Sequence, residues 1–263
     1  MKVLVTGGAG FIGSNLVHTL MSDDRITAVK VLDNLETGRF ANISGFKNHP
    51  KFEFIEGDIR NYALCLGAAK GIDIISHQAA LGSVPRSVKD PITTHDVNAT
   101  GTLNIFNAAR ENNIKRVIYA ASSSTYGDHP GLPKVEDKIG SPISPYGITK
   151  LVNELYAKVF AELYQMEFIG LRYFNVYGPL QNPAGPYAAV IPLFIKALLE
   201  DSSPVINGTG DSSRDFTFVD DVVQANMLAM FTENKSAVNQ AYNIAKGEQT
   251  TLNELYKIGR AHV

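Results

Sequence analysis

Short apolar runs alternate with longer amphipathic stretches from the N-terminus to Phe174. The apolar runs have the length and composition of β-strands, and they lie at 2–6, 28–33, 52–57, 72–76, 116–122 and 168–174. Several are apolar on both faces, which is typical of parallel strands covered by helices on each side. The stretches between them predict helices at 12–21, 60–70, 93–112 and 145–165. This alternation predicts an α/β fold with a Rossmann-type, doubly wound parallel sheet.

The pattern changes after Phe174. Residues 175–190 are rich in glycine and proline and predict a long loop. A helix at 191–200, a short strand at 204–207 and the glycine-rich turn NGTGDSS are expected to follow. We therefore expect a smaller, C-terminal substrate-binding lobe to begin here.

The predicted elements divide the chain into two parts. The first part is a nucleotide-binding domain over residues 1–174, to which residues 215–245 return. The second part is the substrate lobe, which consists of 175–214 and 246–263 and is expected to be truncated.

The last residues have an unusual pattern. The segment TLNELYKI predicts a helix that begins after Thr250 or Thr251 as the N-cap, and GRAHV is expected to end it. The string IGRAHV (258–263) is what a common sequencing adapter encodes in one reading frame. We therefore expect a truncated gene and a non-native ending, which a genomic locus with this ending before a genuine stop codon would contradict.

Composition limits the function classes. The chain has 263 residues, of which 44% are apolar and 19% are charged, so it can bury a sizeable core. The net charge of −2 gives no electrostatic reason to expect nucleic acid or an anionic membrane as partner. Cys65 is the single cysteine, so it excludes an internal disulfide and is expected to be a buried thiol. With no signal-like segment and no run of eighteen apolar residues, we expect a soluble, cytoplasmic protein.

The stretch TGGAGFIG (6–13) follows the first predicted strand directly. Gly7, Gly10 and Gly13 have the spacing of a dinucleotide-binding loop, where they permit a tight turn, close approach of backbone N–H groups to a pyrophosphate, and helix packing on the strand. The helix that follows would direct its positive N-terminus at the phosphates. The loop therefore predicts a bound dinucleotide.

Two acidic residues follow the next strands. Asp33 ends the second strand, where a carboxylate can bind the adenosine ribose hydroxyls and would repel a 2′-phosphate, which favours NAD over NADP. Asp58 fits the edge of the adenine pocket, although it could equally be the N-cap of the helix at 60–70.

The segment SPYGITK (144–150) carries the candidate catalytic pair. Pro145 suits the first turn of a helix, and Tyr146 and Lys150, four residues apart, then share one face. A phenol is a weak base at neutral pH, but a nearby ammonium and a positively charged nicotinamide favour its phenolate. Tyr146 could then exchange a proton at a carbon–oxygen bond while NAD exchanges hydride. No spacing of histidine, cysteine or carboxylates suggests a metal site.

These motifs, together with Asn98 in DVNATGT, SSSTYG and SRDF, resemble the extended short-chain dehydrogenase/reductases and, among them, the NAD-dependent epimerase/dehydratase family. Residues 77–91, 120–137 and 170–178 are most similar to bacterial UDP-N-acetylglucosamine 4-epimerases. The resemblance extends to about residue 257, and full-length members continue for tens of residues that complete the sugar site.

The resemblance assigns a role to each matched residue. It makes Tyr146 the proton acceptor, Lys150 the residue that orients the nicotinamide ribose, and Ser122 the hydroxyl that binds the sugar 4-hydroxyl. The implied cofactor contacts are Gly7, Gly10, Phe11, Ile12, Gly13, Asp33, Asn34, Asp58, Ile59, Gln78, Ala79, Ala80, Asn98, Tyr146 and Lys150. The implied contacts to the nucleotide sugar are Gly82, Ser83, Arg86, Ser122, Ser123, Ser124, Asn175, Gln181, Ala189 and Arg214.

Arg214 has two possible interpretations, and two histidines have no functional role in the resemblance. Arg214 is the candidate diphosphate ligand, because its planar fork suits two phosphate oxygens, and the alternative is a structural ion pair with Asp215. His77 and His129 have no assigned role and are expected to be ordinary structural or surface histidines.

The resemblance implies 4-epimerisation of a UDP-sugar, UDP-N-acetylglucosamine/UDP-N-acetylgalactosamine first, through a transient 4-keto sugar. Sugar 4,6-dehydratases need an Asp/Glu pair where this chain has Ser123 and Ser124, and decarboxylases typically carry a Glu at Ser124. The remaining alternatives are a UDP-glucuronate or UDP-glucose 4-epimerase and a truncated, NAD-binding fragment without turnover. Family members commonly form homodimers through helices that match 93–112 and 145–165.

Overall fold

The computed structural model describes residues 1–184, 189–206 and 208–262. In this part of the chain, a seven-stranded parallel sheet has the order β10-β6-β5-β4-β1-β2-β3. The strands are β1 (Lys2–Thr6), β2 (Ala28–Asp33), β3 (Phe52–Glu56), β4 (Ile74–His77), β5 (Arg116–Ser122), β6 (Glu167–Tyr173) and β10 (Gln240–Ile244). The chain turns in opposite directions on either side of β1 and β4, so a crevice forms at the carboxyl ends of these two strands.

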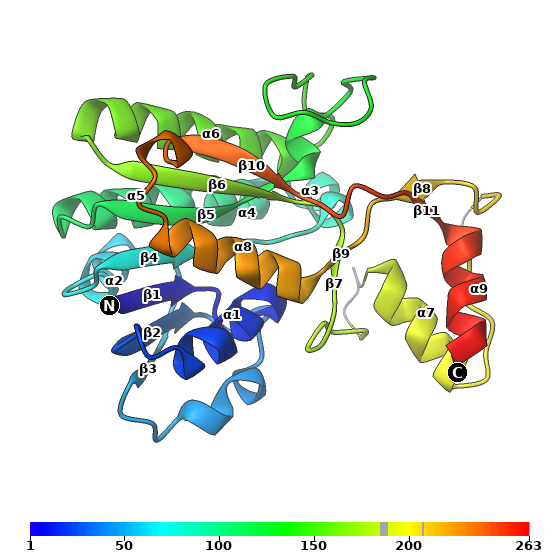
Figure 1. Cartoon of the computed structure of the whole chain (residues 1–263), viewed down its shortest axis with the longest axis horizontal. Helices are drawn as coiled ribbons and strands as arrows, with labels where there is room; N and C mark the ends of the chain where they lie inside the picture. Colours follow the sequence, from blue (N-terminus) through cyan, green and yellow to red (C-terminus); the bar gives the residue numbers. More distant parts are fainter. Residues whose placement is uncertain (185–188, 207, 263) are drawn as a thin grey trace.

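Helices cover both faces of this sheet (Figure 1). Their bounds are α1 (Phe11–Ser22), α2 (Tyr62–Ala68), α3 (Val84–Lys89), α4 (Pro91–His95), α5 (Gly101–Glu111), α6 (Pro145–Tyr164) and α8 (Val219–Phe231). One core lies on the α1 and α8 side, where Leu16 and Val223 are buried. The other lies on the α5 and α6 side around Phe106 and Phe160. The predicted doubly wound α/β fold is confirmed.

The six predicted strands all exist, with ends that differ by at most a few residues. The helix expected at 93–112 is confirmed as a continuous helical stretch, in which a π-helical turn, η3 (Asp96–Thr100), joins α4 to α5. The seventh strand, β10, is absent from the predicted elements, because its sequence QAYNI is less apolar than the other strands. It extends the sheet by pairing in parallel with β6.

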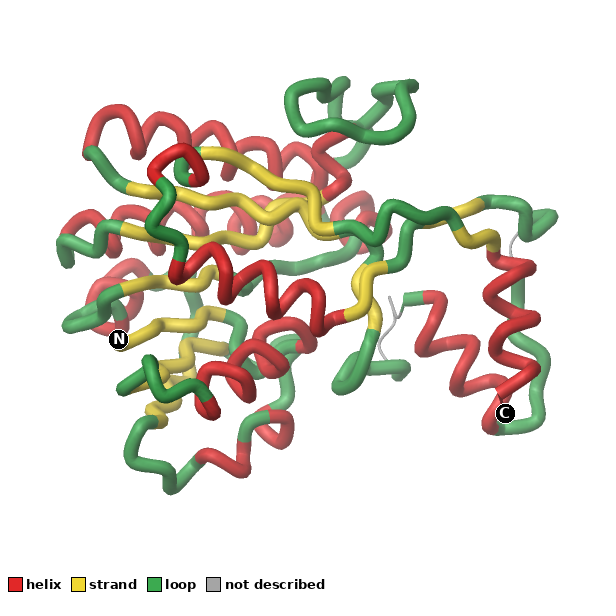
Figure 2. Tube along the Cα trace, in the orientation of Figure 1, coloured by secondary structure: helices red, strands yellow, loops and turns green. Residues whose placement is uncertain are grey.

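A smaller group of elements lies beside the sheet (Figures 1 and 2). It contains α7 (Val190–Leu199), α9 (Leu252–His262) and an antiparallel pair formed by β8 (Ser213–Arg214) and β11 (Thr250–Thr251). The rings of Phe194 on α7 and Tyr256 on α9 have centroids 6.5 Å apart. A parallel pair, β7 (Val176–Tyr177) with β9 (Thr217–Phe218), lies where the chain leaves and re-enters the larger part.

The structure differs from the predicted strand at 204–207 and from the predicted loop at 175–190. Residues 204–206 form a loop and not the predicted strand, since Pro204 lacks an N–H and Val205 is exposed, and residue 207 lies outside the described residues. The loop expected at 175–190 contains β7, and residues 185–188 lie outside the description.

The last helix begins as expected but ends later. Thr251 and Glu254 form a capping box, in which the Glu254 N–H donates to Thr251 Oγ1 (3.1 Å) and the Thr251 N–H donates to Glu254 Oε2 (2.8 Å). The expectation that GRAHV stops this helix is wrong, because α9 continues through Gly259 and Ala261 to His262, and Gly259 lies against Leu198 of α7.

Two further observations concern the described residues as a whole. None of their helices has the length and apolar character needed to cross a bilayer. They also contain no cluster of three or more histidine, cysteine or acidic side chains arranged to hold a metal ion.

Candidate active site

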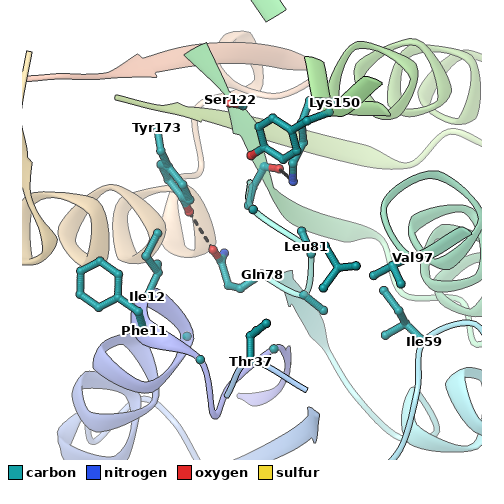
Figure 3. A pocket seen from close by; sticks show the side chains of 18 of the residues that line it. Phe11, Ile12, Thr37, Ile59, Gln78, Leu81, Val97, Ser122, Lys150 and Tyr173 are labelled. Carbon is teal, nitrogen blue, oxygen red and sulfur yellow. Dashed lines mark hydrogen bonds between the residues drawn. The ribbon is translucent and has the colours of Figure 1, made fainter. Parts of the chain in front are cut away.

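A cavity of about 510 Å³ lies at the carboxyl ends of the strands, at the point where the strand order reverses. Its wall combines the glycine loop, the ends of β2 and β3, the loop after β4, the serine stretch after β5 and the first turns of α6. Figure 3 shows Phe11 and Ile12 on one side of this cavity and Ser122 and Lys150 on another. The cavity therefore joins the two groups of residues that the sequence singled out.

The glycine loop has the backbone that a pyrophosphate needs. Gly7 has φ +69°, and a Cβ at this position would lie 2.6 Å from the Ala79 nitrogen. A Cβ on Gly13 would lie 2.1 Å from the Gly7 carbonyl oxygen. The N-cap of α1 is Gly10, which supplies no side-chain cap, so the first N–H groups of α1 are free to bind an anion. These residues fit a dinucleotide phosphate.

The ends of β2 and β3 form the second wall. Asp33 is 7% exposed, and its carboxylate accepts hydrogen bonds from the N–H groups of Ala9 (2.9 Å) and Leu35 (2.8 Å). Burial raises the pKa of Asp33, and these backbone N–H groups partly oppose that effect.

Asp58 lies beside Asp33 in the same wall, but it does not cap a helix. Its carboxylate binds Arg60 and accepts from Asn34 Nδ2 (2.9 Å), and the Arg60 guanidinium lowers the pKa of Asp58 to about 2. The alternative of a helix N-cap is wrong, because Asn61 caps α2 by accepting from the Leu64 N–H.

Tyr146 and Lys150 extend from the first two turns of α6. Ser144 caps this helix by accepting from the Gly147 N–H, and Pro145 occupies its first turn, as expected. Lys150 is 4% exposed and donates to the Ala120 carbonyl oxygen (2.8 Å), and its Nζ lies 5.9 Å from the centre of the Tyr146 ring. Burial lowers the pKa of Lys150 to about 8, against an opposing effect of Glu154.

The pKa of Tyr146 differs from the expectation that Lys150 would lower it. Burial raises the pKa of this phenol, and only a hydrogen bond with Ser122 opposes the rise. The described hydrogen bond of Lys150 goes to the Ala120 carbonyl oxygen, and its Nζ lies 5.9 Å from the centre of the Tyr146 ring.

Most predicted site residues line this cavity. Of the cofactor set, they are Gly7, Gly10, Phe11, Ile12, Gly13, Asp33, Asn34, Asp58, Ile59, Gln78, Ala79, Ala80, Tyr146 and Lys150, and of the substrate set Gly82, Ser122, Ser123, Ser124 and Asn175. Asn98 lies behind the wall, fully buried in the π-helical turn, where its side chain bonds the N–H and the carbonyl of Leu81. It therefore shapes the loop after β4 and does not line the cavity.

The other predicted substrate residues lie elsewhere. Ser83 caps α3, and Arg86 forms an ion pair with Glu36 (3.6 Å) at the rim. Arg214 and Ala189 line a neighbouring cavity of about 720 Å³, which shares Asn175 and Val176 with the first.

Two details of these residues correct the sequence interpretation. Gln181 lines a third cavity, beside α7. No ion pair between Arg214 and Asp215 exists among the described contacts, because the Asp215 carboxylate accepts from the backbone of Lys246 and Gly247.

Sequence reasoning missed several residues of the wall, and Tyr173 is one of them. Its hydroxyl donates to Gln78 Oε1 (3.0 Å) and accepts from Asn226 Nδ2 (2.9 Å), as Figure 3 shows for Gln78. Burial raises the pKa of Tyr173 to about 12, against the opposing hydrogen bonds of Asn226 and Gln78. Its position at the carboxyl end of a predicted strand is the signal that could have identified it. The other missed residues include Glu36, Thr37, Leu81 and Val97.

Residues 3–245 match the sequence profile of the NAD dependent epimerase/dehydratase family. The chain belongs to this family. A UDP-N-acetylglucosamine 4-epimerase from Methanobrevibacter ruminantium M1, solved with UDP-N-acetylmuramic acid, is 42% identical with a TM-score of 0.91, over 98% of this chain and 80% of that one. A putative UDP-glucose 4-epimerase from Methanocaldococcus jannaschii is 41% identical over 97% of this chain and 80% of its own length.

A more distant member of the NAD dependent epimerase/dehydratase family has a different reaction. A dTDP-glucose 4,6-dehydratase from Streptomyces venezuelae, solved with NAD, is 31% identical with a TM-score of 0.90, over 98% of this chain and 80% of that one. Epimerases and dehydratases thus share the fold, so the choice between the reactions depends on the side chains of the cavity.

Proposed function

We propose that the chain catalyses NAD-dependent 4-epimerisation of a UDP-sugar, with UDP-N-acetylglucosamine and UDP-N-acetylgalactosamine as the first candidates. The observation that carries this proposal is the distribution of acids around the cavity. Among the described lining residues, the carboxylates are Asp33, Glu36 and Asp58, which come from the ends of β2 and β3. The wall formed by β5, α6 and β6 contributes serines, Tyr146, Lys150 and Tyr173. Elimination of water would need an acid there, and epimerisation does not.

The chain's own residues have complementary roles in this reaction. NAD, held by the glycine loop and Asp33, supplies a reversible hydride acceptor at the sugar 4-carbon. Tyr146 takes the 4-hydroxyl proton and later returns it, with Ser122 holding the sugar oxygen. Lys150, whose Nζ lies 5.9 Å from the centre of the Tyr146 ring, would hold the nicotinamide ribose, and the positive charge of the bound nicotinamide would favour the ionised phenol. The buried part of this wall would keep water away from a 4-keto sugar.

The second cavity is the proposed place for the rest of the nucleotide sugar. It adjoins the first at Asn175, and Arg214 extends into its wall from β8. Arg214 is exposed and donates one hydrogen bond to the Ser213 carbonyl, so most of its donors remain for a diphosphate. We therefore assign residues 175–214 and 246–263 to the substrate lobe, and residues 1–174 and 215–245 to the NAD-binding domain.

The decisive experiment is a product assay with three substrates. The purified chain is incubated separately with UDP-N-acetylglucosamine, UDP-glucose and UDP-glucuronate, and the 4-epimers are separated by chromatography. We expect the fastest conversion with UDP-N-acetylglucosamine and no net consumption of NAD. Faster conversion of UDP-glucose would indicate a UDP-glucose 4-epimerase, the activity for which the Methanocaldococcus relative is named. A 4-keto-6-deoxy product would contradict epimerisation.

We also propose a homodimer through the outer face of α6 and the helices beside it. Leu155, Val159 and Leu163 lie along α6 with 56%, 46% and 67% of their surface exposed. Ile92, at 74%, adds an apolar side chain from α4, which packs against α6. Such a stripe can pack against its own copy as a four-helix contact. Sedimentation equilibrium should give twice the monomer mass, and Val159→Glu should give the monomer.

A further inference from the structure

The helix that carries Tyr146 and Lys150 has a third polar residue at the same spacing. Glu154 lies four residues beyond Lys150, so the three side chains share one face of α6. Both oxygens of Glu154 accept from Arg172 of β6, at 2.9 Å from Nε and 2.7 Å from Nη2. The two side chains are only 11% and 5% exposed, so this ion pair is buried beneath the candidate active site.

Arg172 connects this ion pair to the serine stretch. Its Nη1 donates to the Tyr126 hydroxyl (3.0 Å) and to the Glu136 carbonyl oxygen (3.0 Å). Tyr126 lies in η4 (Ser123–Tyr126), the turn that follows Ser122, and is 2% exposed. One guanidinium therefore joins α6, β6 and the turn that presents Ser123 and Ser124 to the cavity.

We propose that Glu154 and Arg172 are positioning residues, which keep Lys150 charged and hold the serine stretch against α6. This inference rests on the proposed function, because it gives Lys150 and Tyr146 their roles there. Neither Glu154 nor Arg172 lines the candidate active-site cavity, so both act through residues that do.

The charges around Lys150 determine the expected effect. On α6 it faces Tyr146 and Glu154, and on β5 it faces the Ala120 carbonyl oxygen. His77 on β4 interacts with Lys150 but stays neutral, because burial lowers the pKa of this histidine to about 3. Glu154 is thus the anion that raises the pKa of Lys150, against burial, and the positive charge of Arg172 lies just beyond it.

The variant Glu154→Gln removes the anion and keeps the shape of the side chain. Lys150 then faces the uncompensated charge of Arg172, so its pKa falls and it loses its proton at lower pH. We expect the alkaline fall of kcat/KM for epimerisation to occur at a pH lower by about one unit. Retention of NAD after gel filtration, measured across the same pH range, should show the same displacement without any turnover.

The matched control is Glu167→Gln. Glu167 forms an ion pair of the same 2.7 Å length with Arg116, with side-chain exposures of 10% and 12%, at the opposite end of β6 and β5. We expect both pH profiles of this variant to coincide with those of the unchanged protein. The inference is overturned if Glu154→Gln leaves both profiles in place, or if Glu167→Gln displaces them equally.

A second variant tests the positioning role of Arg172 if Glu154→Gln does not fold. Tyr126→Phe removes the hydroxyl that accepts from Arg172 (3.0 Å) and donates to Asn243 Oδ1 (2.6 Å). Its control is Tyr242→Phe, because the hydroxyl of Tyr242, on the edge strand β10, donates to the Ala237 carbonyl oxygen (3.0 Å). We expect Tyr126→Phe to lower kcat several-fold with unchanged NAD retention at neutral pH. Equal kcat in Tyr126→Phe and Tyr242→Phe overturns the inference.

Failure of the proposed function has a separate signature. If the unchanged protein epimerises no UDP-sugar, the proposed function fails, and the NAD-retention profiles of Glu154→Gln and Glu167→Gln still decide whether Glu154 controls the charge of Lys150.

Discussion

Two Arg–Glu pairs lie at opposite ends of β6, the first between β5 and β6 and the second between β6 and α6. At the amino end, Arg116 binds Glu167, and at the carboxyl end Arg172 binds Glu154, each at 2.7 Å. Arg116 also donates to the carbonyl oxygens of Met230 (3.0 Å) and Thr232 (2.7 Å), so it closes the end of α8 onto the sheet. Lys235 gives Glu167 a second cationic partner. The amino-end pair thus has only structural neighbours.

The carboxyl-end pair has different neighbours. One turn of α6 separates Glu154 from Lys150, and Arg172 contacts the turn after Ser122 through Tyr126. Parallel strands end in loops and helix N-termini on this edge, which leaves polar groups available for a ligand. The two ion pairs have the same length, but only the carboxyl-end pair is connected to the turn that lines the candidate site.

The largest expected effect at the carboxyl end comes from Tyr146→Phe. Loss of the phenolic hydroxyl removes the group proposed to exchange the proton, so kcat should fall by about 10²–10⁴-fold. The ring still packs at the start of α6, and the glycine loop is unchanged. The amount of bound NAD and the midpoint of thermal unfolding should therefore equal those of the unchanged protein. Epimerisation at the original rate would show that another group, such as Ser122, carries the proton.

The carboxyl edge was also the part that the sequence predicted best. TGGAGFIG has a local signal, because a strand, three spaced glycines and a helix follow one another directly. Tyr146 and Lys150 lie on one helix turn, and Ser122 ends a strong apolar strand. Each of these features needs only a few neighbouring residues, so pattern reasoning can identify it.

Other features depend on partners that are distant in the sequence. The 2-residue strand β7 exists only because Val176 and Tyr177 pair with Thr217 and Phe218. Asn98 has a side chain suited to a cofactor, and only the turn of η3 shows that it bonds Leu81 instead. Arg172 is hidden within an apolar strand, and the sequence gives no signal that it reaches Glu154.

Glu167→Gln should have the next largest effect, on stability and not on activity. It leaves Arg116 charged and buried, which should lower the free energy of unfolding by about 3 kcal/mol at neutral pH. Burial alone would raise the pKa of Glu167, but hydrogen bonds from Lys235 and Arg116 lower it below its usual range. The carboxylate therefore stabilises the fold above about pH 4.3, the value in an unfolded chain, and this contribution is lost as pH falls further.

Urea unfolding at several pH values checks this prediction. The difference in unfolding free energy between Glu167→Gln and the unchanged protein should shrink in acid, where Glu167 is protonated. A difference that persists unchanged at low pH would mean that the substitution disturbs packing and not charge. A fall in the kcat of Glu167→Gln at neutral pH would contradict the purely structural role of the Arg116–Glu167 pair.

Ser123→Ala should have the smallest effect, although Ser123 lines the cavity. Ser122 and Ser124 are joined by a hydrogen bond from the Ser124 N–H to Ser122 Oγ (3.1 Å), which fixes the turn without Ser123. The proposed role of Ser123 is to be small and uncharged, and alanine keeps both properties. We expect kcat to fall by about two- to tenfold at most, since an exchanged hydrogen bond contributes about 0.5–1.5 kcal/mol. A rise in KM for UDP-N-acetylglucosamine alone, with UDP-glucose unaffected, would instead make Ser123 a residue that selects the acetamido group.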